Sequence, residues 1–215
     1  MERLTTPVRI AAALREQIAK GALPPGTRLH EVEFTAAFGV SRHTLREAIT
    51  LLVGEGLLTR VSFKGVEVTR LSAEDVRDIY AARRLIELPA VEALRDAPPE
   101  RLSALLAKID DLVALPATVD SQTMNQADVA VHLALVAVHG SNRISAAYAA
   151  LIAEQHILLF SGYNADDVAA TIENHAVFGS LLRKGDDLAA RVQLERRLKR
   201  AEDELVRACR PLIER

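Results

Sequence analysis

The chain has 215 residues, enough for two domains, and its formal net charge of −2 selects no class of binding partner by itself. Aromatic residues make up only 4% of the chain and tryptophan is absent, which favours helices packed through aliphatic side chains. The single cysteine, Cys209, cannot form an intramolecular disulfide. The first residues lack the apolar core of a signal peptide, and the longest apolar run, Val129 to Val138, is shorter than the roughly 20 residues of a membrane span. We therefore expect a cytoplasmic protein without a membrane partner.

Three helices are predicted in the first quarter of the chain. The first covers 7–20, where apolar residues recur at four-residue spacing and Gly21 provides the stop. A proline-rich turn then precedes a short helix near 31–38, and a third helix is expected over about 42–54. The apolar residues of this third helix form one buried stripe, made of Leu45, Ala48, Ile49 and Leu52.

The connection between the second and third helices has the pattern of a helix-turn-helix. Gly39 permits a tight turn between Phe38 and Val40, two apolar residues that can point into a small core, and Ser41 stands where a helix N-cap belongs. Several polar side chains fall largely outside the apolar stripe at the N-terminal end of the third helix, which is the end that such motifs insert into the major groove. These candidate DNA-binding residues are Arg42, His43, Thr44 and Arg46. For the two arginines the alternative is a solvated charge or an ion pair with Glu47 or Glu55.

A β-hairpin is predicted after the third helix. Two β-prone runs, 57–61 and 66–69, flank a turn that contains Lys64 and Gly65. Three helices followed by a hairpin make a winged helix, with Lys64 and Gly65 at the tip of the wing. Residues 1–70 carry ten basic and seven acidic side chains, whereas 71–215 carry seventeen and twenty-two. Only the first part therefore has the positive charge that phosphate binding requires.

Residues 71–215 are predicted to be helical throughout. Ser72 and Asp75 resemble a capping box that opens a helix running to about residue 96, with Pro89 as a predicted kink. The apolar residues of this helix recur at helical spacing; they are Val76, Ile79, Tyr80, Leu85 and Leu88. No β-like alternation appears after residue 70. The predicted fold is therefore mostly α, with an N-terminal winged helix-turn-helix (1–70) and a C-terminal all-helical bundle of six or seven helices (71–215). Further helices are expected near 99–114, 121–139, 143–160, 165–184 and 186–210.

A carboxylate and two imidazoles are candidates for one site in the bundle. Asp128 and His132 are four residues apart on one helix face with apolar neighbours, and His175 lies in a later helix. Such a set suits a divalent metal such as zinc, nickel or manganese. A hydrogen-bonded pair and a buried core histidine explain the same pattern without a metal.

Residues 7–70 resemble the GntR family of bacterial transcription regulators. The resemblance rests on the residues from Gly21 to Leu29, on Gly39-Val40-Ser41-Arg42, and on Leu45-Arg46-Glu47-Ala48-Ile49. It implies that Arg42 and Arg46 contact DNA, with Thr44 nearby and Gly65 approaching a groove. The usual Thr-Pro after Ser-Arg is His43-Thr44 here, and Val32 replaces a common arginine, so base preference can differ from that of similar proteins.

Residues 72–215 resemble the FCD effector domain of the FadR/VanR branch of that family. The resemblance rests on the run from Tyr80 to Glu87, on Asp128 and His132, and on His175 ahead of Lys184-Gly185-Asp186. It implies a homodimer that binds a small organic acid, and a metal held by one aspartate and three histidines. Asp128, His132 and His175 match three of these ligands, and Arg197 stands where the fourth is expected.

Arginine cannot coordinate a cation, which leaves three interpretations of this site. A metal binds through the three matching residues and a water or a ligand carboxylate. Alternatively, His156 or Asn174 replaces the missing ligand. In the third interpretation the metal is lost, and Arg197 neutralises Asp128 or binds an anionic effector directly. Arg83 is a further effector-binding candidate, with an ion pair to Glu87 as its alternative role.

The sequence thus favours a regulator that binds operator DNA under the control of a small organic acid, and that is not an enzyme. A metal-dependent hydrolase using Asp128, His132 and His175 is the less favoured alternative, because no general base, nucleophile or oxyanion donor accompanies these residues. A nucleoid-type DNA binder with a purely structural helical domain is a third hypothesis.

Overall fold

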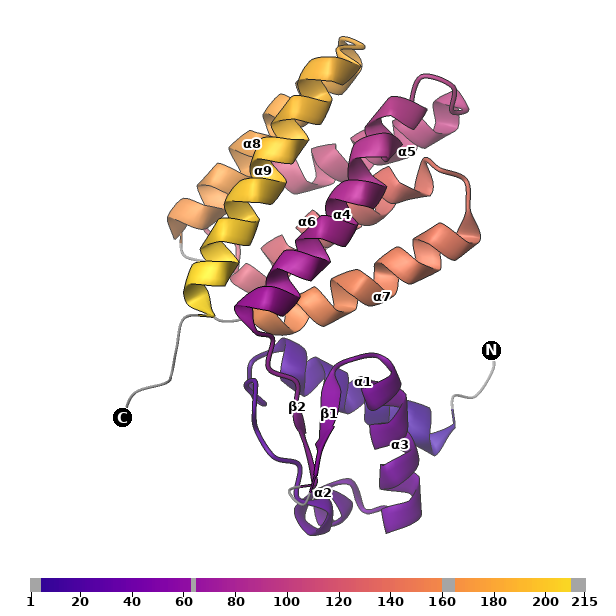
Figure 1. The fold of residues 1–215 in the computed structure, drawn as a ribbon, viewed down its shortest axis with the longest axis vertical. Helices are drawn as coiled ribbons and strands as arrows, with labels where there is room; N and C mark the ends of the chain where they lie inside the picture. Colours follow the sequence, from indigo (N-terminus) through magenta and orange to yellow (C-terminus); the bar gives the residue numbers. More distant parts are fainter. Residues whose placement is uncertain (1–4, 63–64, 160–164, 210–215) are drawn as a thin grey trace. The chain divides into compact units, whose positions relative to one another are not determined.

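The computed structural model describes residues 5–62, 65–159 and 165–209 (Figure 1). The chain divides into two compact units, which are considered separately. One contains residues up to Arg70 together with the end of helix α7 from Ala153, and the other contains the remaining residues.

The first unit has three helices and a two-stranded antiparallel sheet. Strands β1 and β2 pair in the register Leu58↔Val68 to Val61↔Gly65. This arrangement confirms the predicted winged helix. The elements are α1 (Thr6–Ala19), α2 (Glu31–Phe38), α3 (Arg42–Gly54), β1 (Leu58–Val61) and β2 (Gly65–Val68).

The core of this unit joins the predicted stripes of α1 and α3 to one face of the hairpin. Leu14 of α1 and Leu45 and Leu52 of α3 are fully buried. Val68 of β2 is fully buried in the same cluster, so the hairpin packs on the helices. Phe38 and the residue after the turn, Val40, pack against it as expected. Apolar burial thereby sets the position of α3 within the unit.

Among the residues that the structure describes, the second unit contains five whole helices and the first part of a sixth, α7, which confirms an all-helical bundle. Helices α4 and α9 run side by side, and α5 packs against both α6 and α8 (Figure 1). None of the described helices is long and apolar enough to cross a lipid bilayer. The helices are α4 (Ala73–Ala93), α5 (Pro99–Val113), α6 (Ser121–Ala137), α7 (Asn142–Leu159), α8 (Ala165–Arg183) and α9 (Asp187–Ala208).

Helix α4 begins at the predicted capping box. The Ser72 hydroxyl accepts a hydrogen bond from the backbone N–H of Asp75, whose carboxylate accepts one from the backbone N–H of Ser72. The helix continues through Pro89 to Ala93. Leu85, part of the apolar series in the sequence, is 78% exposed. The buried face of α4 instead passes through two charged residues, Arg83 and Glu87.

Candidate nucleic-acid interface and polar site

The N-terminal end of α3 is fixed by the predicted cap. The Ser41 hydroxyl accepts a hydrogen bond from the backbone N–H of Thr44 at 3.1 Å, and the two hydroxyls are 2.8 Å apart. Arg42 and His43 follow the cap and are exposed. The closest carboxylate to His43 is that of Glu47, at 3.6 Å. The first turn of α3 therefore presents polar side chains on a rigid, capped helix end.

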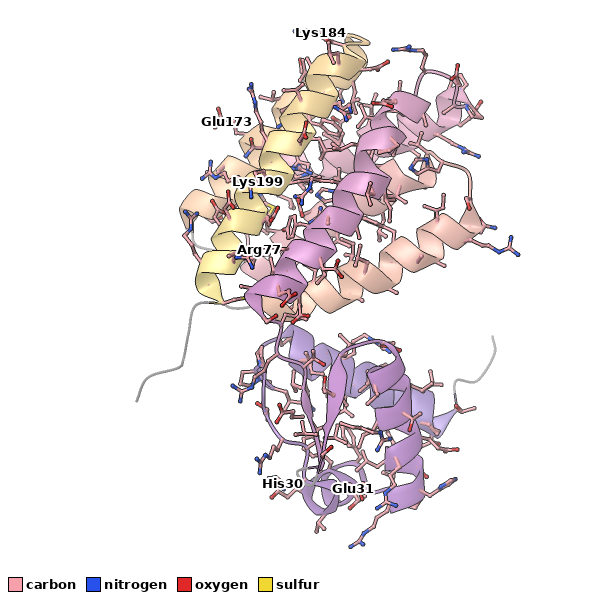
Figure 2. All side chains as sticks on the ribbon, in the orientation of Figure 1. His30, Glu31, Arg77, Glu173, Lys184 and Lys199 are labelled. Carbon is pink, nitrogen blue, oxygen red and sulfur yellow. The ribbon has the colours of Figure 1, made fainter. Side chains whose placement is uncertain are left out.

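Arg46 forms an ion pair that the sequence did not indicate. Its Nε donates to both carboxylate oxygens of Glu31 in α2, at 2.9 and 3.1 Å. The hydrogen bond from Arg46 lowers the pKa of Glu31, which keeps the pair charged. Glu55, one of the partners considered for these arginines, binds Arg15 instead at 2.7 Å. Glu31, labelled in Figure 2, orients the Arg46 side chain. Arg46 is still accessible because its side chain remains largely exposed.

The tip of the wing is described only in part. Lys64 lies outside the described residues. Gly65 has φ +89°, a left-handed conformation that favours glycine, and among the described residues no further atom is within 4 Å of the position that a Cβ would take there. The backbone at this point is therefore open on its side-chain face.

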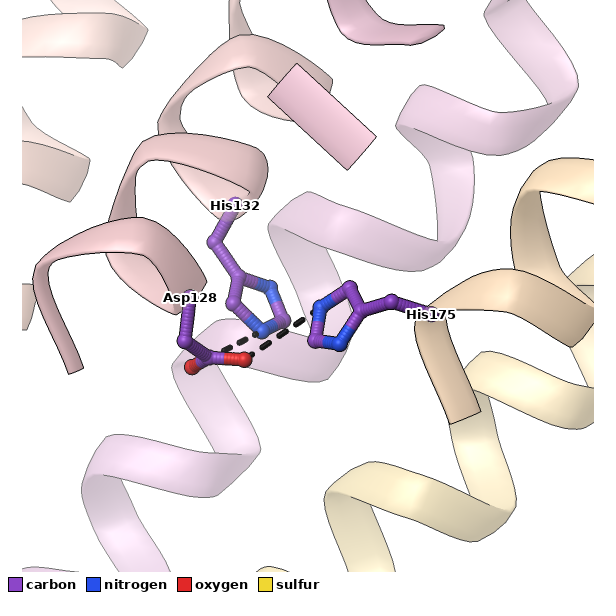
Figure 3. Close-up of side chains that lie close together, drawn as sticks. All are labelled: Asp128, His132 and His175. Carbon is purple, nitrogen blue, oxygen red and sulfur yellow. Dashed lines mark ion pairs between the residues drawn. The ribbon is translucent and has the colours of Figure 1, made fainter. Parts of the chain in front are cut away.

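Asp128, His132 and His175 come together in the helical unit (Figure 3). The first two are on α6 and the third is on α8, so two helices position them. Asp128 Oδ1 is 3.3 Å from His175 Nε2, and Asp128 Oδ2 is 3.6 Å from His132 Nε2. Both histidines are buried. One ligand atom from each residue lies within 4.8 Å of the others, so the group could hold a metal ion.

Hydrogen bonds at Nδ1 fix the orientation of both imidazole rings. His175 Nδ1 is 2.8 Å from the carbonyl oxygen of Thr171, and His132 Nδ1 is 2.6 Å from Glu87 Oε2. A carbonyl and a carboxylate only accept hydrogen bonds, so both Nδ1 atoms carry the proton. In the neutral rings both Nε2 atoms therefore have free lone pairs, the form in which histidine binds a cation.

The guanidinium of Arg197, from α9, meets both of these lone pairs. Its Nη1 is 2.5 Å from His175 Nε2, and its Nη2 is 2.7 Å from His132 Nε2. The residue is half-buried. Arg197 stands at the sequence position of the expected fourth ligand. It therefore lies inside the site, where it donates hydrogen bonds and does not coordinate a metal.

A fully buried ion pair lies behind His132. Glu87 accepts hydrogen bonds from Arg83 Nε and from the Tyr148 hydroxyl, each at 2.6 Å, in addition to its contact with His132. Arg83 is 4% exposed and also lies 3.2 Å from the His132 ring nitrogens through Nη2. Arg83 thus forms the ion pair considered as its alternative role and at the same time touches the site.

The protonation states follow from burial and neighbouring charges. Burial, reinforced by Arg197, lowers the pKa of His175 to about 3. Burial also lowers the pKa of His132. Burial opposes ionisation of Asp128, but the neighbouring His132, His175 and Arg197 outweigh this effect and lower its pKa to about 2. At neutral pH the site thus contains two neutral imidazoles and a charged aspartate.

The Asn174 side chain is not brought to this centre. It donates to the backbone carbonyl of Ala170 on its own helix, and the backbone carbonyl of Asn174 accepts a hydrogen bond from the Gln193 side chain. The side chain of His156 lies outside the described residues. Sequence reasoning named Glu87 only as a partner of Arg83, and missed Tyr148. A buried tyrosine 61 residues from its glutamate partner leaves no local signal.

Models of two protein families match the chain. "Bacterial regulatory proteins, gntR family" matches residues 6–68, which include all of α1–α3 and the hairpin. "FCD domain" matches residues 78–200, more than half of the chain and all four side chains of the polar site.

Similar proteins are transcription regulators. Over 95 residues the chain is 39% identical to the uncharacterized HTH-type transcriptional regulator YdhC of Bacillus subtilis, a match that covers 44% of this chain and only 42% of YdhC. It is 27% identical over 193 residues to the gluconate operon transcriptional repressor of Bacillus subtilis, covering 86% and 79% of the two chains. A crystal structure of a GntR regulator from Rhodococcus sp. RHA1 superposes with a TM-score of 0.80 at 28% identity, covering 94% and 98%.

Proposed function

The chain belongs to the GntR family of bacterial regulatory proteins and carries an FCD domain, and from this we propose that it is a repressor whose DNA binding is controlled by a small organic acid. Residues 1–70 are the proposed DNA-binding domain, and residues 71–215 the proposed effector-binding and dimerisation domain. The protein acts in the cytoplasm, where its operator is. The gluconate operon repressor, similar along most of this chain, supports the repressor assignment.

The observation that carries the DNA-binding role is the capped, exposed end of α3. Arg42, His43 and Thr44 lie in its first turn, and Arg46 is held one turn later by Glu31. Arginine reads guanine edges and phosphates, and threonine contacts either a base or a phosphate. Lys64 and Gly65, at the predicted tip of the wing, add contacts to a second stretch of the sugar-phosphate backbone of the DNA. Two such domains in a homodimer read a pseudo-palindromic operator.

The effector site is the polar cluster of the helical unit. Burying charged groups costs free energy, so stability alone does not explain this cluster. Besides Asp128 and the two histidines, it contains three further charged side chains, those of Arg83, Glu87 and Arg197. Arg83 and Arg197 are the proposed effector-binding residues of this cluster. The Asn174 side chain, which is bonded to its own helix, is not among them, and His156 stays a prediction from the sequence. An acid bound there changes DNA affinity only if it binds the DNA-competent and DNA-incompetent forms of the dimer unequally.

A divalent metal is the other candidate occupant of this site. Asp128, His132 and His175 would hold zinc, nickel or manganese, and the ion would supply a positive charge for the acid's carboxylate. The fit is incomplete because Arg197 donates to both lone pairs that the ion needs.

Selection of duplexes from a random pool, followed by affinity measurements, tests the DNA-binding role. The wild type enriches one pseudo-palindrome, and Arg42→Ala binds it at least roughly tenfold more weakly, since a good base contact is worth about 1–3 kcal/mol. Lys184→Ala, at the end of α8, is the matched loss of charge and leaves the affinity unchanged (Figure 2). Equal affinity for all duplexes would favour a nucleoid-type binder.

A further inference from the structure

We propose that Arg197 replaces the metal ion in this FCD domain, and that its guanidinium binds the carboxylate of a hydroxylated monocarboxylic acid directly. This proposal rests on the proposed function only in placing the effector in the helical unit. It concerns what supplies the positive charge there, and it names the chemical class of the ligand.

The first step is that the three candidate ligands need a cation between them. Asp128 Oδ1 lies 3.3 Å from His175 Nε2, and Oδ2 lies 3.6 Å from His132 Nε2. Both Nδ1 protons point away, to Thr171 and Glu87. A carboxylate and two lone pairs therefore face one another with no proton of their own to share. Such a set is stable only around a positive group that all three can approach.

The second step is that Arg197 is that positive group. It donates to both Nε2 atoms at 2.5 and 2.7 Å, so the lone pairs that would bind a metal are already used. A guanidinium cannot lose its proton, and it belongs to the chain. Its charge is thus present at every metal concentration.

The third step is that Arg197 keeps N–H donors that no carboxylate of the described residues occupies. Arg83 has the carboxylate of Glu87 at 2.6 Å. Within the part of the chain that the structure describes, no carboxylate oxygen lies within 4.0 Å of Arg197, whose two hydrogen bonds go to neutral imidazoles. A guanidinium has five N–H donors in a plane, so an edge remains for a carboxylate to bind with two parallel hydrogen bonds.

Asp128 restricts the ligand to one chemical class. Its side chain is 18% exposed, and it accepts hydrogen bonds but cannot donate them while charged. A second carboxylate on the ligand would be repelled by it, whereas a hydroxyl would donate to it. The site therefore fits an acid with one carboxylate for Arg197 and a hydroxyl for Asp128.

Metal content tests the replacement. After dialysis against a chelator and incubation with zinc or nickel, the wild-type protein retains no ion, whereas Arg197→His binds one ion per chain through four ligands. His132→Ala in the Arg197→His background abolishes this binding. Wild-type protein that retains one ion per chain, and loses it in Asp128→Ala, would overturn the proposal. So would failure of Arg197→His to bind metal, because Arg197 would then not occupy the position of a ligand.

Thermal shifts in the presence of chelator test the ligand class. We expect gluconate or lactate to raise the Tm of the wild type by roughly 5 °C at about 100 times Kd, and propanoate and succinate to raise it less. Arg197→Met abolishes the shift, and Arg197→Lys, which keeps the charge but not the planar fork, reduces it. Arg196→Met, at the exposed neighbouring position of α9, keeps it.

Two outcomes separate this proposal from the proposed function. A shift of equal size in wild type and Arg197→Met, both folded by circular dichroism, would refute the role of Arg197 and leave an acid-responsive regulator. No shift with any of the four acids would also overturn the proposal. In that case the affinity for the selected duplex reports separately whether the DNA-binding role stands.

Discussion

Replacing Glu87 with glutamine removes the charge at the centre of the buried network with little change in shape. Glu87 is fully buried and accepts three hydrogen bonds at 2.6 Å, from Arg83, Tyr148 and His132. The variant leaves the Arg83 guanidinium, 4% exposed, without its carboxylate. Breaking a buried ion pair on one side costs about 3–5 kcal/mol, a large part of the stability of a typical domain. We expect a loss of that size in the free energy of unfolding.

Urea unfolding followed by far-ultraviolet circular dichroism measures this loss. Glu195→Gln is the control, because its side chain is 49% exposed and pairs with Arg191 at 3.9 Å, an interaction worth about 0–1 kcal/mol. The double variant Arg83→Met/Glu87→Gln removes both charges, so neither remains buried without its partner. Its loss in the free energy of unfolding should therefore be smaller than the sum of the losses measured for Arg83→Met and for Glu87→Gln. A loss below about 1 kcal/mol for Glu87→Gln, or strict additivity in the double variant, would refute the interpretation of this pair as a coupled buried network.

Three further predictions concern Tyr148, His175 and the Glu31–Arg46 ion pair. Tyr148→Phe removes a hydrogen bond to the charged Glu87 and should lower the free energy of unfolding, measured by urea unfolding, by about 1.5–3 kcal/mol. No change would contradict this, because the hydroxyl would then be as well stabilised by water in the unfolded chain as by Glu87 in the folded one. The pKa of His175 is lowered from 6.5 to about 3 by folding, so between these pH values the unfolded chain binds a proton that the folded chain does not. The contribution of His175 to the free energy of unfolding is therefore complete above pH 6.5 and is lost as the pH decreases toward 3. Urea unfolding at several pH values should show this loss, and His175→Asn should reduce it between about pH 6.5 and 4.5, above the normal range of carboxylates. Glu31→Gln releases Arg46, so the affinity for the selected duplex should become more dependent on salt, as fluorescence anisotropy at several salt concentrations would show.

Much of the fold could be predicted because its signals are local. Gly39 and Ser41 define the end of α2 and the start of α3, and the predicted range 31–38 is the observed one. The capping box at Ser72 likewise predicted the start of α4. Each of these signals depends on residues within one helical turn, where spacing and conformation are directly linked.

The interior of the helical unit could be predicted less completely. The helical period along α4 counted Leu85 among the apolar residues, yet the buried face follows Arg83 and Glu87. Hydrophobic periodicity does not register a charged pair that is buried because its members neutralise each other. Tyr148 joins this pair from α7, and such long-range packing has no spacing rule in the sequence.

The candidate site shows the same division. The four-residue spacing of Asp128 and His132 indicated a shared helix face, and His175 was a further candidate in a later helix. The resemblance to FCD domains supported these three as one ligand set and identified Arg197 as the position of the fourth ligand. The contacts of Arg197 with both Nε2 atoms required the structure, because three helices must be placed to bring these groups together.

The proposed regulation requires that an acid bound at Arg197 changes the affinity of the protein for DNA. The measurement is the Kd for the selected duplex, with and without the acid that gives the largest thermal shift, for wild type and Arg197→Met. We expect the acid to weaken binding by the wild type by roughly 5–150-fold, the usual range of allosteric coupling. Arg197→Met should bind the duplex as tightly as the wild type and show no response to the acid. An equal response in both proteins, or an acid that binds the wild type without changing its Kd for DNA, would contradict the account.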